Sequence, residues 1–200
     1  MRRLLVVLAA VLVAPALPAG AAREARGLTF ERYLAAMSWP VRASTGRAQS
    51  VSDAIKGSVS PGDPPFLGMV AEGCDKFRDV EEVGRTTGVG AMLLVAPPSS
   101  LAKAHAILAR AYSAARAGCV RARDVALALR RALGRLGINP SEDELARVRG
   151  PALRKLVDFD RTKLRPFKGA VRAWRAAALR HAAAVGVKPP DWLKSLRVPT

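Results

Sequence analysis

Apolar residues recur every three or four positions along most of the chain, which is the spacing of one face of an α-helix. The clearest case is segment 101–119, which follows two prolines and whose apolar positions end at Cys119. Ser99 or Ser100 can accept hydrogen bonds from the free N–H groups of its first turn. We therefore expect a central helix here, with Cys119 pointing into a core.

The same spacing predicts two helices before the central one. The first starts after Thr29 and carries an apolar stripe as far as Ile55, with Pro40 inside it. Because a proline removes a hydrogen bond from a helix interior, we expect a kink or a split between positions 39 and 47. The second helix begins at Phe66 and places Cys74 on its apolar face.

Further helices are expected beyond the central one. The pattern leaves open whether the central helix continues through Gly118 or breaks there, because an internal glycine costs only about 1 kcal/mol. Ser141 and Glu144 form the capping-box pattern that starts a new helix, and Pro151 implies a kink or a restart in it. A last long helix is predicted over 165–185.

These elements together predict the fold class. No segment reads as a strand with a partner nearby. We expect an all-α protein, a small bundle of five to seven helices with kinks at prolines.

The first residues have the pattern of a secretory signal peptide. Arg2 and Arg3 precede an apolar run over 4–17, and Ala19-Gly20-Ala21 is a small-x-small cleavage pattern. We interpret 1–21 as the signal peptide and 22–200 as a single helical domain. No later stretch approaches 18 uninterrupted apolar residues. The predicted location is secreted or in the cell envelope.

Two cysteines in an exported chain favour one disulfide. Cys74 and Cys119 both lie on apolar stripes, and a bond between them closes a loop of 45 residues. In the chain-entropy description such a loop stabilises by roughly 4 kcal/mol. A pair of free buried thiols is the alternative.

Charge is distributed unequally along the chain. Residues 23–100 carry 9 basic and 9 acidic residues, whereas residues 101–200 carry 22 basic and 7 acidic ones, a net charge of +15. Such asymmetry suggests an anionic partner for the second half. With 25 Arg against 8 Lys, a coding bias that scatters arginine over helix surfaces explains it equally well.

The last long helix carries the most suggestive basic pattern. Arg165, Lys168, Arg172 and Arg175 form a stripe beside the apolar one, as in a helix that lies on an anionic surface. The alternative is an ordinary core helix whose long cationic side chains extend past the apolar edge. We take these four residues as the candidate anionic-surface binding site.

Motifs for catalysis, metals or cofactors are absent from the sequence. The glycine-rich stretch 84–90 lacks the Lys-Ser/Thr pair of a phosphate-binding loop. His105 reads as a half-buried helix histidine without a visible partner, and no metal-ligand spacing occurs. We predict no catalytic residues, no metal and no cofactor.

The leading interpretation is a non-enzymatic exported protein that binds anionic envelope polymer or lipid headgroups through its basic second half. DNA binding is not expected in an exported chain. One alternative is an exported glycan-cleaving enzyme with a carboxylate pair. Another is a subunit of an envelope complex, with Trp174 or Trp192 exposed as an anchor; oligomeric state is not predicted.

Overall fold

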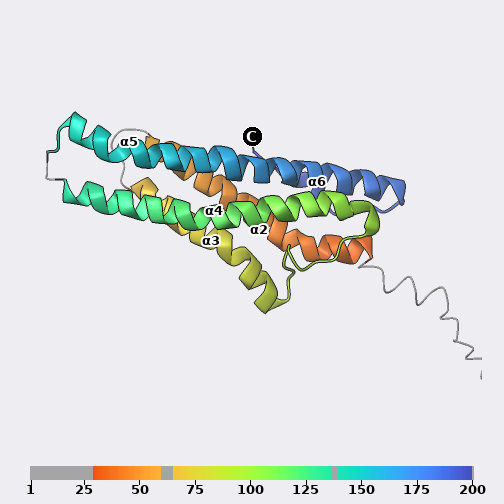
Figure 1. Ribbon diagram of the computed structural model, residues 1–200. Helices are drawn as coiled ribbons and strands as arrows, with labels where there is room; N and C mark the ends of the chain where they lie inside the picture. The colour runs from red at the N-terminus through yellow and green to blue at the C-terminus, as the bar shows by residue number, and fades with distance from the viewer. Residues whose placement is uncertain (1–28, 60–64, 137–138, 200) are drawn as a thin grey trace, which may run out of the picture.

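Four helical rods run alternately in opposite directions in the computed structural model (Figure 1). The structure describes residues 29–59, 65–136 and 139–199, so the expected signal peptide lies outside the described residues. The elements are α2 (Phe30–Val59), α3 (Pro65–Thr87), the short turn η1 (Ser99–Leu101), α4 (Ala102–Arg135), α5 (Glu142–Phe159), the π-helical turn η2 (Asp160–Leu164), α6 (Arg165–Ala184) and α7 (Asp191–Ser195).

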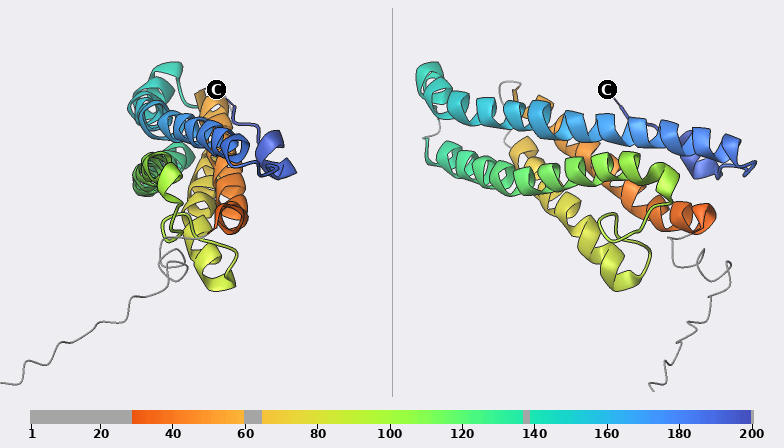
Figure 2. Two further views of the ribbon diagram at one scale, coloured as in Figure 1. Left: turned by 90° about the vertical axis from the view of Figure 1, so that its right-hand side faces the viewer. Right: turned by 45° about the vertical axis from the view of Figure 1, so that its right-hand side comes forward.

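The fourth rod is continuous across three of these elements. Residues in α5, η2 and α6 follow one another without a break, and the rod lies antiparallel to α4 (Figure 1). Figure 2 shows α2 and α3 together on the other side of this pair. No strand occurs among the described residues, and the predicted all-α class is confirmed.

Two positions at which the sequence allowed an interruption lie inside continuous helices. α4 runs through Gly118, which settles a point that the pattern left open. α2 runs through Pro40, where a kink or a split was expected, and the split does not occur. Proline has no N–H to offer the Ala36 carbonyl. Gly90 packs directly on that carbonyl, with φ of 105°, and a Cβ at this position would overlap it. Tight packing therefore holds α2 together where propensity alone predicts a break.

Apolar stripes from all four rods meet in one core. Tyr33, Met37 and Val41 of α2 are fully buried, as the stripe predicted. The ring of Phe77 packs edge-on against Phe167, with centroids 5.4 Å apart. The apolar stripe predicted for the last helix is buried with one exception: Val185, just after α6, is 49% exposed.

The cysteines face the same core but are not bonded. Cys74 of α3 and Cys119 of α4 are fully buried free thiols, and their side chains lie 3.4 Å apart. A disulfide requires about 2.05 Å between sulfurs, so the predicted bond is not present. Close packing beside each cysteine sets the helix spacing, because a Cβ on Gly73 would lie 2.7 Å from Val51 and one on Gly118 would lie 2.6 Å from Phe159. None of the helices described here is both long and apolar enough to cross a membrane.

Candidate functional site

The four candidate basic residues of α6 differ in exposure: Lys168 is buried, Arg175 is half-buried, and Arg165 and Arg172 are exposed. Lys168 is only 2% exposed, and its ammonium group donates to Gln49 Oε1 at 3.2 Å and to Ser52 Oγ at 3.4 Å. Arg165 Nε donates to Asp160 Oδ2 at 3.0 Å. Two of the four candidate residues therefore belong to a polar cluster between α2 and the π-helical turn.

That cluster is buried at Lys168 and Asp160 and reaches the surface at Arg165, whose side chain is 59% exposed. Ser52 Oγ donates to Asp160 Oδ1 at 2.5 Å, and Asp160 is 4% exposed. Burial lowers the pKa of Lys168, while the nearby Asp160 carboxylate opposes that shift. Each buried side-chain polar atom of this cluster has a hydrogen-bond partner, which is the condition under which buried charge is tolerated.

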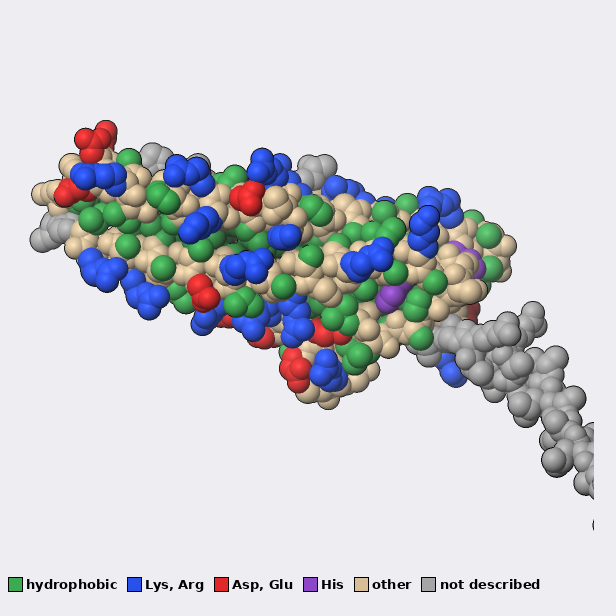
Figure 3. Space-filling view, in the orientation of Figure 1, with side chains coloured by type: hydrophobic (Ala, Val, Ile, Leu, Met, Phe, Trp, Pro, Cys, Tyr) green, Lys and Arg blue, Asp and Glu red, His purple; other side chains and the backbone are tan. Residues whose placement is uncertain are grey.

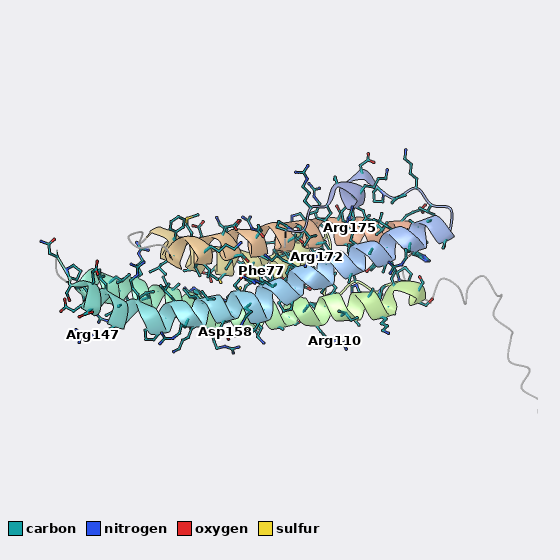
Figure 4. All side chains as sticks on the ribbon, turned by 90° about the horizontal axis from the view of Figure 1, so that it is seen from above. Phe77, Arg110, Arg147, Asp158, Arg172 and Arg175 are labelled. Atoms are coloured by element: carbon teal, nitrogen blue, oxygen red, sulfur yellow. The ribbon has the colours of Figure 1, made fainter. Side chains whose placement is uncertain are left out.

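The other two candidate residues hold the C-terminal segment against α6. Arg172 Nη1 donates to the Pro199 carbonyl at 3.0 Å, and Arg175 Nε donates to the Leu193 carbonyl at 2.8 Å. Figure 4 labels both arginines, beside the C-terminal segment. Trp192 of that segment stacks on the fully buried Trp174, with centroids 6.3 Å apart. Trp174 therefore presents no exposed anchor for a partner.

A groove with free cations lies elsewhere, between α4 and the rod of α5 and η2. The π-helical turn inserts an extra residue per turn into the rod, a feature found frequently at functional sites. Gly118 of α4 allows the close approach of Phe159, which forms part of the groove wall. The groove has a volume of about 480 Å³. Its lining residues are Gly118, Arg121, Ala122, Asp124, Val125, Lys155, Asp158, Phe159, Thr162 and Lys163.

The charges of this groove are not balanced within it. Asp158 pairs with Arg161 at 2.7 Å, and Asp124 pairs with Arg123 at 3.4 Å, so both carboxylates are held by arginines that do not line the groove. None of the ion pairs among the described residues includes any of its three cations, which are Arg121, Lys155 and Lys163. These three are therefore available to an anion.

Figure 3 shows the setting of the groove on the surface. Apolar side chains follow the line between α4 and the rod, and basic side chains lie above and below that line. Acidic side chains on this face are fewer. An apolar floor with a cationic rim suits a ligand that is both anionic and partly apolar.

A separate hollow of about 460 Å³, which shares no lining residue with the groove, lies between α2 and the C-terminal segment. Arg42 and Arg197 line it together with Trp192, and Gln49 connects it to the buried Lys168. None of the four residues of the predicted basic stripe lines this hollow. Lys168 hydrogen-bonds to its lining residue Gln49, and Arg172 and Arg175 hold the C-terminal segment that forms one of its walls.

The two carboxylates of the groove lack the surroundings that acid–base cleavage of glycans requires. Glycoside cleavage needs one carboxylic acid that stays protonated opposite a second carboxylate. Asp124 and Asp158 share the groove, yet each is paired with an arginine rather than enclosed by apolar groups. Glu81 is fully buried away from the groove; its Oε1 accepts from the Leu93 amide at 3.0 Å, and its Oε2 has no hydrogen-bond partner among the described residues.

Sequence reasoning missed Arg121, Lys155 and Lys163 as a group. Arg121 and Lys155 lie on predicted helices, and Lys163 lies in the π-helical turn, which was not predicted. Arg121 is 34 positions from Lys155, and only the packing of α4 on the rod brings the three to one groove. Val125 forms part of the apolar floor of the groove. Among the described residues no three His, Cys, Asp or Glu side chains gather as a metal site requires. No known family, curated protein or solved structure matches the chain.

Proposed function

We propose that this protein is a non-enzymatic binding protein of the cell envelope, which holds an anionic ligand in the groove between α4 and the rod of α5 and η2. The observation that carries the proposal is the set of three cations without ion-pair partners, Arg121, Lys155 and Lys163, around an apolar floor. Carboxylate or phosphate groups of envelope polymers or lipid headgroups are the matching chemistry.

The net charge of the second half supports the same ligand class. Residues 101–200 carry +15, so the field around α4 to α7 attracts anions before contact. Arg165, Lys168, Arg172 and Arg175, the site proposed from the sequence, act in this scheme through that field and through the packing of the C-terminal segment. Export by residues 1–21 places the protein where such ligands occur.

The test compares two triple variants of equal charge. One carries Arg121→Gln, Lys155→Gln and Lys163→Gln in the groove. The matched control removes three cations that lie outside the groove and in no ion pair among the described residues, as Lys103→Gln, Arg110→Gln and Arg180→Gln. Figure 4 shows Arg110 on α4, apart from Asp158 of the groove.

Binding is measured to phosphatidylglycerol vesicles across a salt series. Each cation near an anionic surface contributes about 1 kcal/mol, so losing three site cations lowers affinity roughly 100-fold. The control triple is expected to lose much less, and all binding weakens as salt rises. Equal losses in the two triples would show diffuse attraction without a site. No binding of the unaltered protein at low salt would refute the proposal.

A further inference from the structure

The groove continues along α4 beyond its cationic part. A second hollow of about 270 Å³ shares Val125 and Lys155 with the first and extends to Ala132 on α4 and Val148 on α5. Its other lining residues are Ala128, Leu129, Pro151 and Ala152. The two hollows therefore adjoin each other along α4 between Gly118 and Ala132, and together they are called the channel.

The two ends of this channel differ in polarity. Arg121 and Lys163 line only the first hollow, together with both aspartates. Lys155, where the hollows meet, is the one charged residue that lines the second. A ligand that matches the channel has an anionic group at one end and hydrocarbon along the rest.

The length of the two hollows together is on the scale of one acyl chain. Fourteen residues of α4 separate Gly118 from Ala132, a distance of about 21 Å, and one leaflet of a bilayer, roughly one acyl chain, is about 15 Å thick. An anionic group held at Arg121 and Lys163 therefore leaves an apolar stretch of that order for a hydrocarbon chain.

We propose, on the basis of the function proposed above, that the ligand is a single-chain anionic amphiphile. Its carboxylate or phosphate lies between Arg121 and Lys163, and its acyl chain lies over Leu129 and Val148. The cations neutralise the headgroup at one end, and burial of the chain supplies the hydrophobic part of the affinity at the other.

The probes are palmitate, octanoate and a palmitoyl lysophosphatidylglycerol, each titrated below its micelle concentration into the full purified protein by calorimetry. Palmitate is expected to bind one to one and at least about 100-fold more tightly than octanoate, because octanoate leaves the second hollow unfilled. Comparing palmitate with the lysophospholipid shows whether a carboxylate or a phosphate is preferred; binding of either supports the inference. Failure of both to bind would overturn it.

A matched pair of substitutions in α4 locates the chain. Ala128→Trp fills the second hollow, while Ala106→Trp adds the same side chain at an exposed position that lines none of the channel. We expect Ala128→Trp to weaken palmitate binding at least tenfold and Ala106→Trp to leave it unchanged, with both variants melting as cooperatively as the parent. Equal palmitate affinity in the two variants would overturn the inference.

The same variants separate this inference from the function on which it rests. Salt-sensitive binding to phosphatidylglycerol vesicles tests the three groove cations, whereas palmitate binding also tests the apolar hollow. If the parent binds vesicles in the groove but not palmitate, the acyl chain assignment fails and the anion site stands. If palmitate affinity survives replacement of Arg121, Lys155 and Lys163, the headgroup assignment fails.

Discussion

At the residue scale, a polar chain inside the core shows how three rods are held in register. Trp174 Nε1 donates to the Tyr33 hydroxyl at 2.7 Å, and that hydroxyl lies 3.0 Å from His105 Nδ1. Because the indole N–H occupies Tyr33 as an acceptor, the tyrosine proton is free to be donated to Nδ1. His105 is then neutral, with its proton on Nε2. One residue each from α2, α4 and α6 takes part.

The neutral state of His105 makes stability depend on pH. Burial lowers the pKa of His105 below its ordinary value of 6.5. Near pH 6.5, His105 therefore binds a proton in the unfolded chain but stays neutral in the folded one. The free energy of unfolding decreases as pH falls below about 6.5. Urea unfolding between pH 7.5 and 5 should show this slope, and His105→Leu should lose it. His181→Gln is the control and should keep the slope; a slope unaffected by His105→Leu would contradict the assignment.

The sequence predicted the apolar residues of this core but not their polar partners. Tyr33 and His105 are 72 positions apart, so the histidine looked isolated. The same holds for Lys168, whose spacing with Arg172 suggested a surface stripe. Its partner Gln49 lies 119 positions away on another rod. Helical spacing shows which face a residue occupies, whereas the structure alone shows what lies opposite that face.

At the element scale, the helices were predictable because apolar spacing and caps agree over long segments. The capping box of Ser141 and Glu144 is present as expected, and it begins α5. The split that was one alternative at Pro40 and the restart that was one alternative at Pro151 do not occur, since both prolines lie inside continuous helices. A local rule predicts a break, but burial of the helix face on its neighbours outweighs the lost hydrogen bond.

The π-helical turn η2 was not predicted either. It directs some of its side chains into the interior of the bundle and others into the groove. Asp160 at its start points to Ser52 in the interior, while Thr162 and Lys163 line the groove. The extra residue per turn shifts the faces of α5 relative to those of α6. Nothing in the spacing of apolar residues around 160–164 reports such an insertion.

Two glycines inside helices provide a test of this packing. A Cβ on Gly118 would lie 2.6 Å from the buried Phe159 ring and 3.2 Å from Lys163, whereas one on Gly46 meets nothing within 4 Å. Gly118→Ala should destabilise by about 1–3 kcal/mol through overpacking. Gly46→Ala should stabilise by about 0.5–1 kcal/mol through helix propensity. Denaturant unfolding measures both, and equal stability of the two variants would contradict the close approach of α4 to the rod.

At the scale of the whole molecule, the charge split along the chain becomes a split between layers. The neutral first half contains α2 and α3, and the second half, at +15, contains α4 and the rod of α5 to α6 (Figure 2). An up-and-down order of rods makes this inevitable, because consecutive rods are neighbours. Scattered arginine alone would give a basic layer as well. What distinguishes a site is the groove, where cations gather without carboxylate partners of their own.

The two layers are also joined at the cysteines, and thiol reactivity therefore reports how the bundle opens. Cys74 and Cys119 are fully buried, and a hydrogen bond with Cys74 together with burial raises the pKa of the Cys119 thiol. Since the thiolate is the reactive species, a disulfide-exchange reagent should label neither cysteine in the folded protein and both after denaturation without reductant. Any labelling under native conditions should occur at the rate at which the protein unfolds. A count of zero after denaturation would show a bond that this packing does not contain, and rapid native labelling would show that α3 separates from α4 without global unfolding.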